Sequence, residues 1–263
     1  MRYLSRKNRT ILREMVVTDF KVRYQGSLLG YLWSVLKPLF LFAILYIIFT
    51  YVFKVGKGIP HYPVYLLLGI ILWNFFTEAT IVGASSVVSH GDLIRKISIP
   101  RYLVVAASSV SALINLCFSL VAALIIALFN GLRPELSWLL LPLLFLELFA
   151  LALAVAFILA AAYVKYRDVS YIWEILLQAG FYASAILFPL QLVPVQYQKW
   201  FFVNPIVQIV QDARYLGVTH DTITIWSKVG LPFVAYPFLV IIAVAVVAKF
   251  YFKKQSRLFA ENI

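Results

Sequence analysis

The chain has 263 residues, of which 63% are hydrophobic and only 13% are charged, and its 23 Lys and Arg outnumber its 11 Asp and Glu. Soluble globular domains carry about 45–50% apolar and about 25% charged residues, so this composition excludes an ordinary soluble domain and indicates an integral membrane protein. In such a protein the positive excess reflects topology and contact with anionic lipid headgroups, and we expect no nucleic-acid partner. The single cysteine, Cys117, excludes a disulfide framework and a cysteine-based metal site.

Residues 8–26 predict an amphipathic helix near the N-terminus. Apolar residues recur along one helical face, namely Ile11, Leu12, Met15, Val16 and Phe20, and the remaining faces are polar and charged. This period is typical of a helix that lies in the plane of the membrane interface. A frayed, charged tail is the alternative, which the sustained apolar period disfavours.

Six apolar segments are long enough to cross the membrane, because about 20 apolar residues span the hydrocarbon core. They cover residues 29–53, 63–88, 102–129, 136–164, 171–192 and 230–252. No internal repeat or low-complexity linker divides the chain. We therefore predict an all-α integral membrane fold of six transmembrane helices, in which residues 1–263 form a single transmembrane domain.

The distribution of Lys and Arg predicts how these spans are oriented. If both chain ends are assigned to one side of the membrane, most of the 23 Lys and Arg residues fall on that side. The opposite loops hold only Lys54, Lys57, Arg133, Lys199, Arg214 and Lys228. By the positive-inside rule, both termini and the amphipathic helix are cytoplasmic, in a multi-pass membrane protein.

Residues 194–218 lie between the last two predicted spans, on the external side. They are too polar to cross the membrane alone, yet Trp200 and its aromatic and aliphatic neighbours keep them close to the lipid. Pro205 removes a backbone donor and disfavours a helical conformation at Asn204. We predict a pair of short re-entrant helices that dip into the outer leaflet and are broken at Asn204–Pro205.

Residues that could carry chemistry are few. The three histidines fall in loops, and the sequence contains neither a nucleophile elbow nor a G-x-x-x-x-G-K-[ST] phosphate loop. We therefore expect no catalytic residue, no metal site and no ATP hydrolysis by this chain. Three acids lie within the apolar runs: Glu78, Glu147 and Glu174. Acids in a membrane are functional candidates by default, and a coupling-ion role is one alternative. Glu78 pairs with Asn74 at helical spacing and is expected to face inward.

The segment "DFKVRYQGSLLGYLWSVLKPL", Asp19 to Leu39, resembles the N-terminal signature of permease subunits of type-2 ABC exporters for polysaccharides and polyol phosphates. The signature falls on Arg23, Tyr24, Ser27, Leu29, Gly30, Trp33 and Pro38. Further matches follow in the same order, at "GIILWNFF", "LIRKISIPR", "KYRDV", "FPLQLVP" and "VNPIVQIVQDARY". The resemblance covers nearly the whole chain.

This resemblance implies one half of a homodimeric channel in a bacterial plasma (inner) membrane, assembled with two copies of a separate nucleotide-binding ATPase subunit. ATP and Mg²⁺ would be bound by that partner, and this chain would hold no cofactor. The implied substrate is a lipid-linked polysaccharide of the undecaprenyl-diphosphate type, such as O-antigen or teichoic acid. Two alternatives stay open: a membrane-embedded enzyme acting on lipid-linked sugars, and a drug or ion-coupled exporter of the same type-2 fold.

The resemblance also implies a coupling helix in the 89–101 loop, which would dock on the ATPase. Its residues would be Asp92, Leu93, Ile94, Arg95, Lys96 and Ile97. Leu93, Ile94 and Ile97 would form an apolar ridge, Asp92 would cap the helix, and Pro100 would end it. At the cytoplasmic mouth, a diphosphate headgroup would meet Arg9, Arg13, Arg23 and Tyr24, because Arg pairs bidentately with phosphate oxygens. Binding of anionic lipid is the alternative there.

Two further groups of residues are assigned along the path of the substrate. The candidates that line the channel are Tyr31, Trp33, Trp73, Phe75 and Phe76. Their aromatic faces suit contact with sugar rings, and packing between neighbouring spans is the alternative. The candidates for the external gate are Pro189, Pro194, Trp200, Asn204, Pro205 and Arg214.

Overall fold

The computed structural model describes residues 6–24, 26–27, 29–56, 58–96, 99–228, 234–256 and 259. The description covers the backbone but not the side chains of Arg23, Tyr24, Tyr31 and Lys228. Every regular element within these ranges is helical. The all-α fold class predicted from the sequence is therefore confirmed.

Five helices are long and apolar enough to cross a membrane, and they correspond to five of the six predicted spans. They are α2 (Trp33–Ile47, continued by a π-helical turn, Ile48–Val52), α3 (Tyr62–Ser89), α5 (Arg101–Phe129), α6 (Leu141–Lys165, entered through a 3-10 turn, Leu136–Leu140) and α12 (Tyr236–Gln255). The shorter helices are α1 (Arg6–Tyr24), α4 (Gly91–Lys96), α7 (Val169–Ala183), α8 (Val195–Phe201), α9 (Pro205–Gly217) and α10 (Ile225–Lys228). Two 3-10 turns, Gly30–Leu32 and Leu190–Leu192, precede α2 and α8.

Helix α3 forms the centre of the bundle. It packs against α2, α5, α6, α7 and α9, and it is buried along nearly all of its length. A helix that is apolar on every side is stable only where neighbours cover all of its faces. By contrast, α2 and α7 bury one side against α3 and leave much of their apolar surface exposed.

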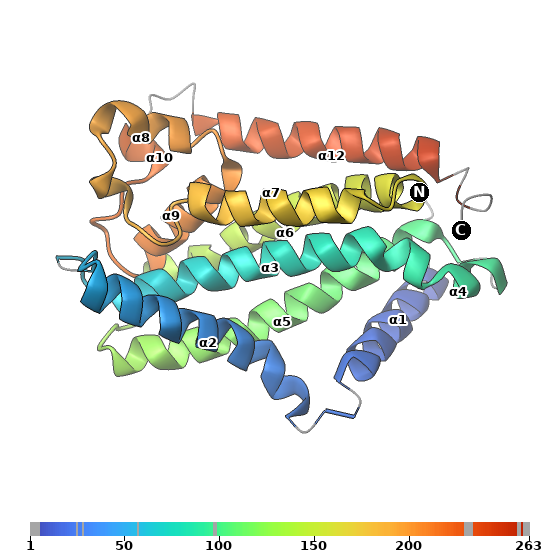
Figure 1. The fold of residues 1–263 in the computed structure, drawn as a ribbon, viewed down its shortest axis with the longest axis horizontal. Coiled ribbons are helices and arrows are strands. Elements are labelled where there is room, and N and C mark those ends of the chain that lie inside the picture. Colours follow the sequence, from blue (N-terminus) through green and yellow to red (C-terminus); the bar gives the residue numbers. More distant parts are fainter. Residues whose placement is uncertain are drawn as a thin grey trace.

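The two ends of the bundle are formed by different helices. Helices α1 and α4 and the C-terminal end of α12 lie at one end, and α8, α9 and α10 gather at the other (Figure 1). The predicted topology assigns the first end to the cytoplasm and the second to the external side. Residues 194–218 hold two short helices, α8 and α9, with a break before Pro205, and their role as re-entrant gate helices stays a prediction.

The predicted span at 171–192 differs from the observed structure. Helix α7 ends at Ala183 after 15 residues. Its length is about 22 Å, whereas a membrane span requires about 20 residues, or about 30 Å of helix. The chain then runs without helical hydrogen bonding to Pro189, and Ala185 takes a left-handed conformation with φ of 50°. The count of six spans therefore stays a prediction, and the fifth segment is a helix that breaks inside the bundle.

The side chain of Arg214, on α9, donates hydrogen bonds to backbone carbonyls at this break. Its Nη1 donates to the carbonyl of Ala185 at 2.8 Å and its Nη2 to that of Ile186 at 2.6 Å. Its Nε donates to the carbonyl of Tyr65 at 3.0 Å, and its guanidinium carbon lies 3.8 Å from the centre of the Tyr65 ring. Arg214 is 0% exposed. Backbone that leaves a helix within a membrane protein must find partners inside the protein, and here one arginine bridges α3, α9 and the break.

Gly69 makes room for this arginine. A Cβ atom at this position of α3 would lie 2.6 Å from Nη2 and 3.3 Å from Cζ of Arg214. Any larger residue would push the guanidinium away from α3. The start of α9 is fixed to the same break, because Asn204 caps Ile206 N at 3.0 Å and donates to Ser184 Oγ at 3.0 Å.

We predict that Arg214→Lys destabilises the protein. A lysine ammonium lacks the planar fork that bonds three carbonyls at once, and each buried carbonyl left without a donor costs about 1–3 kcal/mol. The expected result is a fall of about 4 °C or more in the melting temperature of the purified protein. Arg133→Lys, at an exposed position in the loop before α6, is the matched control. Equal melting temperatures for Arg214→Lys and wild type would contradict the proposed role of Arg214.

Candidate functional site

The surface predicted to meet the ATPase is built from α1, α4 and α5. Met15 and Val16 of α1 are buried against Val104 and Ala107 of α5. Leu93 and Ile94 of α4 pack on the same cluster. The apolar side of α4 is therefore used within the protein, and it holds α4 against α1 and α5.

This packing shows where the apolar side of α4 lies. Leu93 and Ile94 are half-buried against their own chain, and Ile97 lies outside the described residues, so the apolar ridge that would dock on the ATPase stays a prediction. Asp92 lies within the first turn of α4 and is therefore not the residue that caps the helix. Its negative charge interacts favourably with the helix N-terminus. The solvent-facing residues of α4 are Asp92, Arg95 and Lys96. The surface that α4 exposes to solvent is charged, because its apolar side packs against α1 and α5.

A hydrogen-bonded pair joins α1 to the end of α3, one residue before α4. His90 Nε2 lies 3.1 Å from Asp19 Oδ1, and His90 Nδ1 lies 2.9 Å from the carbonyl of Ser86. Both ring nitrogens face acceptors, so the doubly protonated imidazolium satisfies both contacts. The hydrogen bond to Asp19 raises the pKa of His90 above its usual value, while burial opposes this effect.

We predict that this link weakens as the pH rises. Because the folded pKa of His90 lies above the unfolded value of about 6.5, its contribution to stability is complete below that pH and is lost as pH rises through the folded pKa. Hydrogen exchange of α1, corrected for its intrinsic pH dependence, is expected to speed up across this window. Asp19→Asn is expected to flatten the change, and an unchanged profile in Asp19→Asn would exclude the pair as its cause.

The residues predicted to bind a headgroup lie on α1. Arg9 and Arg13 are exposed, one helical turn apart, and so are available to an anionic group. The side chains of Arg23 and Tyr24 lie outside the described part of the structure. This assignment therefore stays a prediction that rests on two exposed arginines.

A cavity of about 400 Å³ lies between α2, α3 and α5. Its polar lining includes Lys37, Asn74, Glu78 and Asn115, and Asn115 Nδ2 donates to Glu78 Oε1 at 2.7 Å. Asn74 and Glu78 thus face inward, as their spacing predicts. The hydrogen bond with Asn115 gives Glu78 a structural partner on α5.

The aromatic candidates for the channel lining are packed between helices. Trp73 contacts Phe76 and Phe181, with ring centres 5.9 and 6.1 Å apart, and Phe76 contacts Trp173 at 6.2 Å. Phe75 is also buried, whereas Trp33 is 45% exposed. The side chain of Tyr31 is not described. For the three buried residues this geometry matches the packing alternative, and a lining role stays a prediction.

Three of the candidate gate residues, Pro189, Asn204 and Arg214, lie at the break after α7. Pro189 and Pro194 precede the Leu190–Leu192 turn and α8, and Trp200 on α8 is exposed. Sequence reasoning placed Arg214 in this group but missed its partners, Tyr65, Ala185 and Ile186, and also the role of Gly69. Two features of the sequence could have indicated these contacts: an arginine in a segment expected to lie within the membrane, and a glycine in an apolar span.

Comparisons with known proteins agree over most of the chain. Residues 11–216 match the family model described as ABC-2 type transporter. The chain is 29% identical over 261 residues to "O-antigen export system permease protein RfbA" of Myxococcus xanthus, which covers 97% of this chain and 96% of that protein. It is 26% identical over 225 residues to the protein of the same name from Klebsiella pneumoniae (81% and 86%). It is 24% identical over 201 residues to "Polysialic acid transport protein KpsM" of Escherichia coli (76% and 78%). The chain belongs to the ABC-2 type transporter family.

Proposed function

We propose that this protein is the membrane subunit of an ATP-driven exporter that moves a lipid-linked polysaccharide, such as O-antigen or a capsular polymer, across the bacterial plasma membrane. The observation that carries the proposal is the near full-length similarity to a permease named for O-antigen export. The similarity to a polysialic acid transport protein supports the same class of substrate. On this proposal the chain itself catalyses no reaction.

The exposed flank of the protomer supports assembly with a second copy. Phe40, Ile44 and Ile47 project outward from α2, and Ile172 and Ile175 project from α7. Helices α2 and α7 border one cavity together with α3, so both lie on the same side of the central helix. A homodimer that joins these flanks would place the substrate path between two copies of α2 and α7.

The cytoplasmic end supports docking of a separate ATPase, which would bind ATP and Mg²⁺. Helix α4 presents Asp92, Arg95 and Lys96 to solvent. Its other side is attached to α1 and α5 through apolar contacts, and it follows α3 after His90 alone. A displacement of α4 by the ATPase would therefore move α1, α3 and α5 together, at the site where Arg9 and Arg13 would receive a diphosphate headgroup.

We predict that the double variant Asp92→Lys, Lys96→Glu loses its ATPase. Both side chains are exposed, so the loss of their favourable interactions with the ends of α4 is expected to cost only about 0.3–1 kcal/mol each, while the reversed charges oppose a complementary charged surface. The measurements are co-purification of the partner ATPase and the amount of polysaccharide at the cell surface. Both are expected to fall by about tenfold or more.

Lys21→Glu on α1 is the matched control, because Lys21 is an exposed cation of the α1 helix. It is expected to retain the ATPase and export. If the double variant binds the ATPase and exports polysaccharide as wild type does, α4 is not the docking surface.

A further inference from the structure

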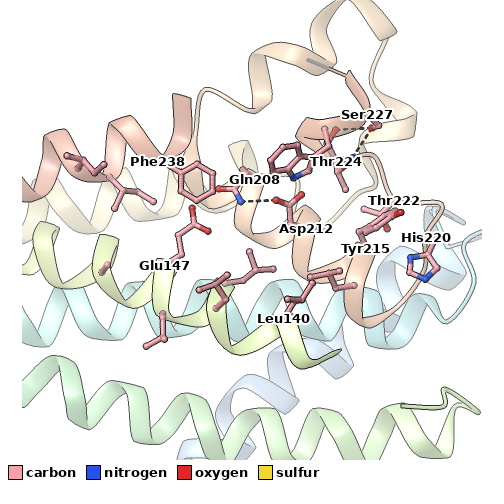
Figure 2. Close-up of a pocket in the computed structure, with 18 residues that line it drawn as sticks. Leu140, Glu147, Gln208, Asp212, Tyr215, His220, Thr222, Thr224, Ser227 and Phe238 are labelled. Carbon is pink, nitrogen blue, oxygen red and sulfur yellow. Dashed lines mark hydrogen bonds between the residues drawn. The ribbon is translucent and has the colours of Figure 1, made fainter. Parts of the chain in front are cut away.

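A large cavity lies at the end of the bundle opposite α4. It has a volume of about 1070 Å³ and is formed by α6 with the 3-10 turn before it, α9, α10 with the segment that leads to it, and α12 (Figure 2). Pockets for small ligands usually enclose about 300–1,000 Å³, so this one suits a larger molecule. Leu143, Leu146 and Ile242 line it and are also exposed on the flank of the protomer. The cavity therefore borders an apolar outer surface.

One end of this cavity is acidic. Glu147 of α6 points toward Gln208 and Asp212 of α9 (Figure 2). Gln208 Nε2 donates to Asp212 Oδ2 at 2.8 Å, and the two residues are 1% and 8% exposed. Burial raises the pKa of the Asp212 carboxyl to about 6. Two carboxyl groups thus meet in a poorly hydrated site, where opposite charge is needed to stabilise their ionised forms.

Three acceptor oxygens of this cluster have no donor among the described residues. They are Glu147 Oε1, Gln208 Oε1 and Asp212 Oδ1, and each is fully buried. A buried acceptor without a partner is costly, and native proteins rarely leave several of them together. The side chains that carry these oxygens line one cavity, so a single ligand with several donors can satisfy the oxygens once the side chains turn toward it.

We propose that this cavity binds a phospholipid whose headgroup carries a primary ammonium, as in phosphatidylethanolamine. An ammonium group has three N–H donors and no acceptor, which matches the number and type of the unpartnered oxygens. Its positive charge complements Glu147 and Asp212. A quaternary ammonium has the charge but no donors, and a neutral sugar has donors but no charge.

The rest of the lining fits the remainder of such a lipid. Thr222, which lines the cavity, has a buried hydroxyl without a partner among the described residues, so it can donate to the phosphate. Phe238, Ile241 and Ile242 of α12 provide an apolar wall for the acyl chains. A single cavity would therefore provide acids for the ammonium, a hydroxyl for the phosphate and an apolar wall for the acyl chains of one lipid.

The cavity lies at the end of the bundle that holds α9 and α10. With the predicted topology, the bound lipid belongs to the outer leaflet. This inference depends on that topology and not on the transported substrate.

The test measures lipid preference on the purified protein, without ATPase or glycan, so its outcome is independent of the proposed function. Short-chain phosphatidylethanolamine, phosphatidylcholine and phosphatidylglycerol are titrated in detergent, with the melting temperature and native mass spectrometry as readouts. Wild type is expected to bind phosphatidylethanolamine about tenfold or more tightly than the other two, because only its headgroup satisfies the three acceptors. The double variant Glu147→Gln, Asp212→Asn is expected to lose this preference.

Asp221→Asn is the matched control, since Asp221 is an exposed acid at the same end of the protein and does not line the cavity. It is expected to keep the wild-type preference. Equal binding of the three lipids by wild type would overturn the proposal, and this comparison needs no variant to fold. The proposal is also overturned if the double variant keeps the preference for phosphatidylethanolamine. It is overturned as well if a second copy of the chain covers the cavity and no lipid is retained there.

Discussion

Within a membrane, backbone carbonyls that leave a helix must find hydrogen-bond donors inside the protein, and in this fold the guanidinium of Arg214 supplies them. Helix α7 ends within the bundle, and the carbonyls of Ala185 and Ile186 would have no donor without an arginine from α9. The same group bonds the carbonyl of Tyr65 on α3, which is possible only because Gly69 leaves space. The break after α7, the position of α9 and the outer half of α3 are therefore fixed together, at the cost of desolvating one charge.

The opposite end is assembled differently. There, α1 and α4 are held by apolar side chains on α5 and by the titratable pair of His90 and Asp19. Apolar contacts are non-directional and allow small displacements, whereas three hydrogen bonds to one guanidinium fix its geometry. On the proposed function, this contrast places the movable part of the protein at the ATPase and the rigid part at the external face.

Much of this architecture is predictable from local patterns. Hydropathy locates five spans, the apolar period locates α1, and Pro205 marks the start of α9. The break after Ala183 is not predictable in this way, because the residues up to Leu192 are as apolar as those of a span. Contacts between distant residues decide it, as they decide that Leu93 and Ile94 face α1 and that Glu147 meets Asp212. Of the candidate site, the charged residues of α4 were predictable and the orientation of its apolar side was not.

A double-mutant cycle between Gly69→Ala and Arg214→Lys tests the central claim most directly. In the wild-type background the added methyl group displaces the guanidinium, so Gly69→Ala lowers the melting temperature. In the Arg214→Lys background the displaced group is already absent, and we expect the same substitution to have little further effect. Contacting residues typically couple by about 0.5–3 kcal/mol. Additive losses of stability would show that the two residues act independently, and would contradict the account.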